Sequence, residues 1–187
     1  MTNENKDKLS TPVDRLPQIR KEYNNAEEIM EDIDLHFIHF KKFFIQLDGN
    51  YATLTKLKKS FPTKYIELDD FEDLLLKASQ GKHNSLEMSK VATGMSSELD
   101  TKLEFFMANM KIYMAEDALK LLNFPKPTDT MREAYINTKK EITELKILHD
   151  RFETLSSSLD KLYKMFENDE INFRRFMEKK DKLRGLK

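Results

Sequence analysis

The strongest constraint on the fold is an unbroken heptad pattern of apolar residues in the first quarter of the chain. Steps of four and three residues alternate between successive members over four repeats. A helix of 3.6 residues per turn brings such positions onto one face, so the segment from Pro17 to Asp48 is predicted to be a helix that packs along a partner helix. The pattern consists of Ile19, Tyr23, Ala26, Met30, Ile33, Phe37, Phe40, Phe44 and Leu47.

This helix also carries apolar residues outside the pattern. A helix that is apolar on more than one side contacts more than one neighbour. We therefore expect its second half to lie inside a thicker bundle. Proline suits a first helical turn and glycine a C-terminal stop, so Pro17 and Gly49 are the expected ends. The additional apolar residues are Leu35, Ile38, Phe43 and Ile45.

Capping residues and glycines divide the middle of the chain into further predicted helices. The predicted elements are a short helix at 51–60 that Asn50 caps and Pro62 ends, a short helix at 70–80 with Asp69 as its cap and Gly81 as its stop, a loop at 81–84, and a long helix at 84–123 in which Gly94 permits a kink. The second half of the long helix has two apolar stripes, which predict burial on two sides. One stripe is Leu99, Leu103, Phe106, Met110 and Tyr113, and the other is Phe105, Ala108, Ile112, Ala115, Leu119 and Leu122.

Two prolines at 125 and 127 form the clearest boundary, because neither can continue a helix. Thr130 with Glu133 forms a capping box that is expected to restart a helix at Met131. Apolar residues from Leu148 to Phe176 keep a heptad spacing, with a skipped position at Asp169. The helix is expected to run for about 50 residues, and Asn168-Asp169 is the expected point of any interruption. We expect a disordered tail at 1–16, a helical arm at 17–124, and a C-terminal helical hairpin arm with a basic tail at 125–187.

Composition supports an all-α, elongated bundle of long amphipathic helices with coiled-coil character. The chain has four glycines, five prolines and no cysteine, which excludes a disulfide framework and a thiolate zinc site. It has no catalytic or phosphate-loop motif, so we expect neither an enzyme nor a cofactor. No apolar run is long enough to span a bilayer, which predicts a cytoplasmic protein without a membrane partner.

One set of side chains on the first helix has metal-ligand character. Asp32, His36 and His39 share a helical face, where a transition metal would find three donors. No second cluster supports them, and a solvated histidine pair is the more common explanation. We therefore predict no metal site.

Two basic segments are the candidate site. Residues 51–65 hold four lysines and no acid, with Tyr51, Phe61 and Tyr65 interleaved, and residues 171–187 hold seven basic and two acidic side chains. Such patches bind phosphate backbones by counterion release, and exposed aromatic rings stack on unpaired bases. The alternative is that the lysines complement helix C-termini and that Phe173 and Phe176 belong to the core. The candidate residues here are Lys56, Lys58, Lys59, Lys64, Arg174, Arg175, Lys179 and Lys180.

The stretch from Lys111 to Lys180 resembles the T4-type phage recombination mediators, the UvsY family. The resemblance covers a little over a third of the chain. It is carried by Lys111-Ile-Tyr113, by Thr130 to Lys140, and by the helix with Leu148, Phe152, Leu155, Leu159 and Leu162. It implies an all-helical oligomer that binds single-stranded DNA and helps load a RecA-like recombinase onto strands covered by single-strand-binding protein. Lys111 is the nearest position to the DNA-contacting basic residues of that family.

Two other functions fit the same residues. A phage scaffold, chaperone or other assembly protein would use the coiled-coil helices themselves, and a peripheral bundle would bind anionic lipids through its lysine-rich ends. The long apolar seams favour a homo-oligomer. The alternative is that 17–48 and 131–166 pack on each other within one chain.

Overall fold

The structure, a computed structural model, describes residue 23 and residues 25–63, 70–123 and 126–185. Every regular element in these ranges is helical, which confirms the predicted all-α class. The elements are α1 (Ala26–Lys59), α2 (Phe71–Met110), a π-helix η2 (Lys111–Ala115), α3 (Glu116–Leu121), α4 (Asp129–Asn137) and α5 (Lys140–Gly185). None of the described helices has the length and apolar content needed to cross a bilayer.

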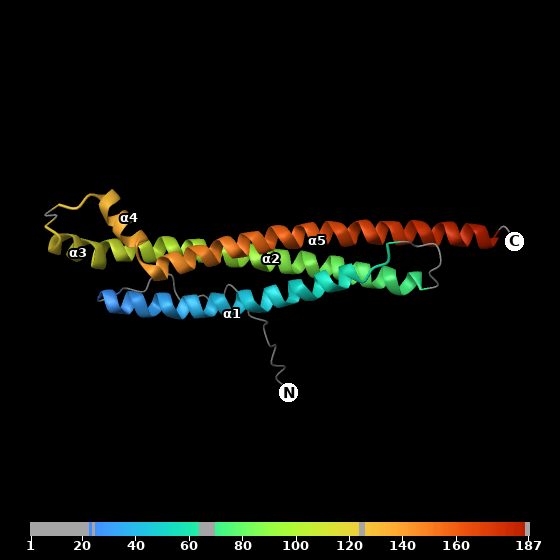
Figure 1. The fold of residues 1–187 in the computed structure, drawn as a ribbon, viewed down its shortest axis with the longest axis horizontal. Helices are drawn as coiled ribbons and strands as arrows, with labels where there is room; N and C mark the ends of the chain where they lie inside the picture. Colours follow the sequence, from blue (N-terminus) through green and yellow to red (C-terminus); the bar gives the residue numbers. More distant parts are fainter. Residues whose placement is uncertain (1–22, 24, 64–69, 124–125, 186–187) are drawn as a thin grey trace, which may run out of the picture.

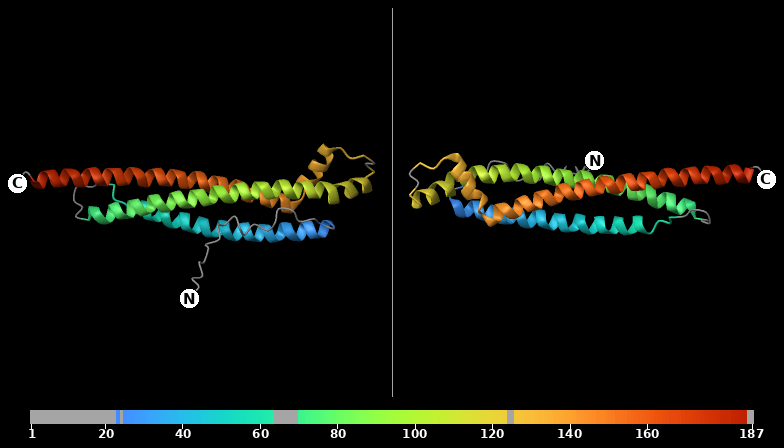
Figure 2. Two further views of the ribbon diagram at one scale, coloured as in Figure 1. Left: turned by 180° about the vertical axis from the view of Figure 1, so that it is seen from behind. Right: turned by 45° about the horizontal axis from the view of Figure 1, so that its top comes forward.

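Three long helices lie side by side and form an elongated bundle (Figure 1). α1 and α5 run in the same direction and α2 runs against them, while α3 and α4 form a turn at one end (Figure 2). α5 has 46 residues, so it is about 70 Å long. Both α1 and α2 pack against α5 within this one chain. The expected arms at 17–124 and 125–187 therefore share one bundle, and residues 1–16 lie outside the described ranges.

The predicted seam of α1 faces the core. Ile33, Phe40 and Leu47 are buried, and Phe37 and Phe44 are half-buried between them. Asn25 caps the helix by accepting a hydrogen bond from the backbone N–H of Glu28 at 3.0 Å. The predicted start at Pro17 lies outside the described residues.

The predicted stop at Gly49 and the separate helix at 51–60 are wrong, because α1 continues to Lys59. The buried side chains of Leu54 and Phe61 extend the seam beyond Gly49, and this packing outweighs the weak helix propensity of one glycine. Of the additional apolar residues of this helix, Phe43 packs against the core, whereas Leu35, Ile38 and Ile45 are exposed.

α2 is one helix where two helices and a loop were predicted. Asp70 occupies the N-cap position and the helix passes through Gly81 and Asn84 without a break. The small residues of this stretch face α5, where they allow the two helices to pack closely. A Cβ at Gly81 would lie 2.5 Å from a ring atom of Phe166. The buried small residues are Ala78, Gly81, Ser85, Ser89, Ala92 and Ser96.

The π-helix shifts burial from the first predicted apolar stripe to the second. Leu103, Phe106 and Met110 of the first predicted stripe are buried, and the next buried residue, Ala115, follows Met110 by five positions. A π-turn holds one residue more than an α-turn, so this spacing keeps Ala115 on the inner side. The second stripe is divided, because Leu119 is buried whereas Ile112 and Leu122 are exposed.

The C-terminal half contains two helices in place of the predicted single one. Thr128, not Thr130, caps α4 by accepting from the backbone N–H of Met131 at 3.3 Å. α4 ends at Asn137, and α5 begins at Lys140 and passes through Asp169 without interruption.

Candidate nucleic-acid interface

The two predicted basic segments lie at the same end of the bundle. Lys56, Lys58 and Lys59 belong to the last turn of α1. Nζ of Lys58 lies 2.8 Å from a carboxylate oxygen of Asp169 on α5. This ion pair joins segments that are more than 100 positions apart in the sequence. Four residues separate Asp169 from the next basic side chain of α5, so the two basic segments lie close together. The basic side chains of α5 are Arg174, Arg175, Lys179 and Lys180.

Asp169 occupies the skipped position of the α5 heptad, with the apolar residues Phe166 and Phe173 on either side of it. Both of these phenylalanines are buried, and Asp169 is itself only 8% exposed. A carboxylate in an apolar seam is costly unless it is paired. Lys58 supplies the opposite charge, so it holds α1 in register against α5 and is not available to a ligand.

A second buried carboxylate lies beside the first. Glu170 is 4% exposed and forms ion pairs with Lys82 of α2 and with Arg174, whose Nη2 is 2.5 Å away. The hydrogen bond from Lys82, followed by that from Arg174, holds the pKa of the Glu170 carboxyl below its usual value. Arg174 is therefore an internal partner of α5 and a weaker candidate for DNA binding.

The aromatic side chains of this end belong to the core. Phe61 and Phe173 are buried, with ring centroids 5.7 Å apart, and Phe71 stacks on Phe176. Lys180 lies over the Phe71 ring at 5.6 Å. The expected stacking platforms for bases are thus not exposed here, and Tyr65 lies outside the described residues.

Four predicted cations remain exposed at this end: Lys56 and Lys59 on α1, and Arg175 and Lys179 on α5. Within the described ranges, no carboxylate forms an ion pair with any of them. Arg175 and Lys179 are four positions apart and so share a face of α5. Lys64 lies outside the described residues.

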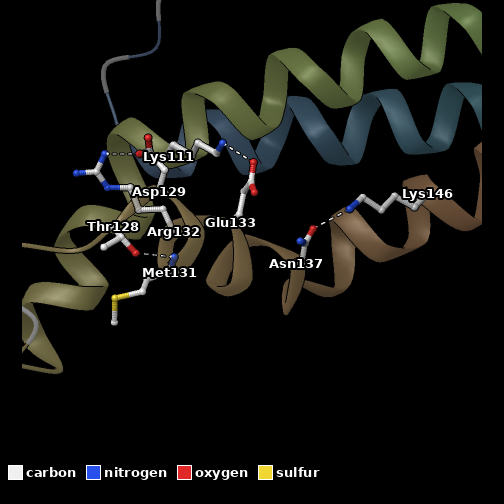
Figure 3. Close-up of polar contacts among 8 residues, drawn as sticks. All are labelled: Lys111, Thr128, Asp129, Met131, Arg132, Glu133, Asn137 and Lys146. Carbon is white, nitrogen blue, oxygen red and sulfur yellow. Dashed lines mark hydrogen bonds and ion pairs between the residues drawn. The ribbon is translucent and has the colours of Figure 1, made fainter.

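Lys111 does not join this group. It begins the π-helix, and its Nζ lies 2.7 Å from Oε1 of Glu133 on α4 (Figure 3). This contact lowers the pKa of the Glu133 carboxyl. Glu133 precedes the start of α5, whereas Asp169 lies 29 residues into that helix. Lys111 is therefore roughly 40 Å from the end of the bundle that holds the two basic segments, which we call the basic end.

The side chains of Asp32, His36 and His39 each contact other residues of the chain. Asp32 accepts a hydrogen bond from the Tyr23 hydroxyl at 2.6 Å, and the rings of His36 and His39 pack against phenylalanines. Among the described residues, donor atoms of His149, Asp150 and Glu153 lie within 4.8 Å of one another on one helix. This cluster was not predicted from the sequence, in which His149 stands alone.

Comparisons of the chain with protein-family models, with curated proteins and with solved structures found no match.

Proposed function

We propose that this protein binds single-stranded DNA at its basic end and has no catalytic role. The observation that supports this is the Lys58–Asp169 ion pair, which brings the exposed lysines of α1 and the exposed cations of α5 to one end. Cations at one end of an elongated bundle release counterions together when a phosphate backbone binds. Such contacts carry no base specificity, which suits a protein that must bind any strand.

The biological role that we propose is that of a phage recombination mediator in the host cytoplasm. It would hold the strand while a RecA-like recombinase replaces single-strand-binding protein. Support for this role comes from the resemblance of residues 111–180 to T4-type mediators. The position of Lys111 at the far end removes one part of that support, since its side chain pairs with Glu133.

Titration of a labelled oligo-dT with salt tests the DNA proposal. The wild type should bind with a log–log salt slope of about −3, because four phosphate contacts contribute roughly −0.7 each. Replacing Lys56, Lys59, Arg175 and Lys179 by alanine should weaken binding at least tenfold and bring the slope close to zero. The control replaces four exposed lysines elsewhere: Lys42, Lys90, Lys126 and Lys140, of which Lys90 and Lys140 pair with carboxylates of their own helices.

The control variant loses the same total charge, so a general electrostatic effect would weaken both variants equally. Equal loss would overturn the assignment of the site to the basic end. Absence of wild-type binding at low salt would overturn the DNA proposal and leave an assembly protein as the second candidate. The exposed apolar side chains of Leu35, Ile38 and Ile45 on α1 favour that candidate.

A further inference from the structure

A groove runs along the bundle between the parallel helices α1 and α5. It consists of two adjoining hollows of about 390 and 320 Å³, which share Phe44, Ile147 and Arg151. Its floor and walls are largely apolar, yet Ile45 is 61% and Ile147 is 48% exposed. An apolar groove with exposed isoleucines at its rim is typical of a surface that a partner covers.

The charges beside the groove follow a regular order. On α1, Lys41 and Asp48 lie one heptad apart, with Ile45 between them. On α5, Glu144 and Arg151 also lie one heptad apart, with Ile147 between them. The two helices run in the same direction, so the order of the charges is positive to negative on α1 and negative to positive on α5.

We propose that this face binds a second copy of the chain in an antiparallel dimer. The two-fold axis of this dimer lies in the interface, perpendicular to α1 and α5, at the level of Ile45 and Ile147. It places α1 against α1 of the second copy and α5 against α5 of that copy, with each pair antiparallel. Lys41 then faces Asp48 of the second copy, and Glu144 faces the Arg151 of that copy. The two exposed isoleucines meet their equivalents near the axis.

The outer face of α1 favours this antiparallel order along its whole length. The face begins with carboxylates, including Glu27 and Glu31, and ends with Lys56 and Lys59. In the antiparallel dimer the acidic part of α1 in one copy lies beside the lysines of α1 in the other copy. DNA competes with these carboxylates for Lys56 and Lys59, while Arg175 and Lys179 lie on α5.

Sedimentation velocity across the micromolar range tests the dimer. The wild type should have twice the mass of the 22.2 kDa chain. Replacing Ile45 and Ile147 by aspartate should give a monomer with an unchanged circular dichroism spectrum, because both side chains are exposed. The matched control replaces Leu76 and Val91 of α2, also exposed, and should remain a dimer. A monomeric wild type, or a control that dissociates equally, would overturn the proposal.

Charge reversal tests the order of the helices. Lys41→Asp places two acids opposite each other and should weaken the dimer at least tenfold. Adding Asp48→Lys restores opposite charges only if α1 faces α1 in the antiparallel order. Failure of the double variant to recover the dimer overturns that order. None of these substitutions touches the four cations proposed to bind DNA, so failure of this proposal and failure of the DNA proposal are distinguishable.

Discussion

Gly81 lies directly beneath the ring of Phe166. A Cβ at this position would be 2.5 to 2.7 Å from three ring atoms, which is closer than such contacts allow. Gly81→Ala must therefore displace the ring, and we expect a loss of about 1–3 kcal/mol in the free energy of unfolding. Urea denaturation followed by circular dichroism measures this loss, which opposes the better helix propensity of alanine.

Gly94 provides the matched control, since it lies within the same helix. A Cβ there meets no described atom within 4 Å outside the helix itself. Gly94→Ala should raise the free energy of unfolding by about 0.4–1 kcal/mol, because alanine has fewer conformations to lose on folding. A gain of stability in both variants would show that α5 does not pack closely on Gly81.

Glu170 makes the stability of the bundle depend on pH on the acid side. Lys82 and Arg174 hold the pKa of this buried carboxyl below its usual value of 4.5. The folded state therefore binds the proton more weakly than the unfolded state, and the stabilisation is present above the unfolded pKa and is lost as the pH falls through the folded pKa. Below neutral pH, Glu170→Gln should lose less stability than the wild type, as measured by urea denaturation at a series of pH values.

The variant should be less stable than the wild type at pH 7, because a neutral amide leaves Lys82 and Arg174 without their buried partner. The two stability curves should approach each other as the pH falls. Parallel curves over the whole range would mean that other carboxylates cause the acid loss.

At the scale of the elements, the π-helix at Lys111–Ala115 holds one residue more than the α-helical spacing needs. Ile112 is 62% exposed within it. Deleting Ile112 should convert the turn to α-helix, keep Met110 and Ala115 on the inner side, and leave the melting temperature nearly unchanged. Circular dichroism melting checks this.

Deletion of Gly94 is the control, because it also removes an exposed helical residue. In regular α-helix one deletion rotates everything beyond it by about 100°. Ser96, Leu99 and Leu103 would then leave the interface with the rest of the bundle, and we expect unfolding or a large fall in melting temperature. A similar loss in both deletions would mean that the π-turn does not absorb the missing residue.

The sequence predicted the class and the seams of these elements better than their ends. Ile33, Phe40, Leu47 and the α5 heptad are apolar and periodic, so their burial follows from their spacing. Gly81 and Ser85 belong to an equally regular buried stripe, but their residue types are also typical of caps and loops. Only the presence of Phe166 opposite Gly81 distinguishes the two possibilities, and that contact links positions 85 residues apart.

The residue types of the candidate site were predictable from the sequence, but the ion pairs that its cations form were not. The basic segments are visible in the sequence, but which cations remain exposed depends on Asp169 and Glu170. The heptad does single out Asp169, because this residue occupies a position where an apolar residue is expected. A carboxylate buried at such a position needs an oppositely charged partner. That this partner is Lys58 depends on the register between α1 and α5.

At the scale of the whole molecule, the bundle has two hydrophobic clusters, and the half-buried side chains of Tyr51 and Met88 pack against both. The larger cluster includes Phe40 and Phe152, and the smaller one, at the basic end, includes Phe166 and Phe173. Next to Met88, the buried hydroxyl of Ser89 donates to Asp160 at 2.6 Å. A small cluster at the end of an elongated bundle opens at a lower free energy than the main core.

Phe152→Ala and Phe173→Ala compare the two clusters, since both rings are fully buried. Each truncation removes about 3–5 kcal/mol, but we expect different patterns of amide hydrogen exchange. Phe173→Ala should speed exchange at the basic end and leave the amides around Phe40 protected, whereas Phe152→Ala should lower protection throughout. If Phe173→Ala lowers protection equally everywhere, the bundle is one cooperative unit. Local opening would also separate the α1 lysines from the α5 cations, so the same variant should bind oligo-dT more weakly while the main core stays folded.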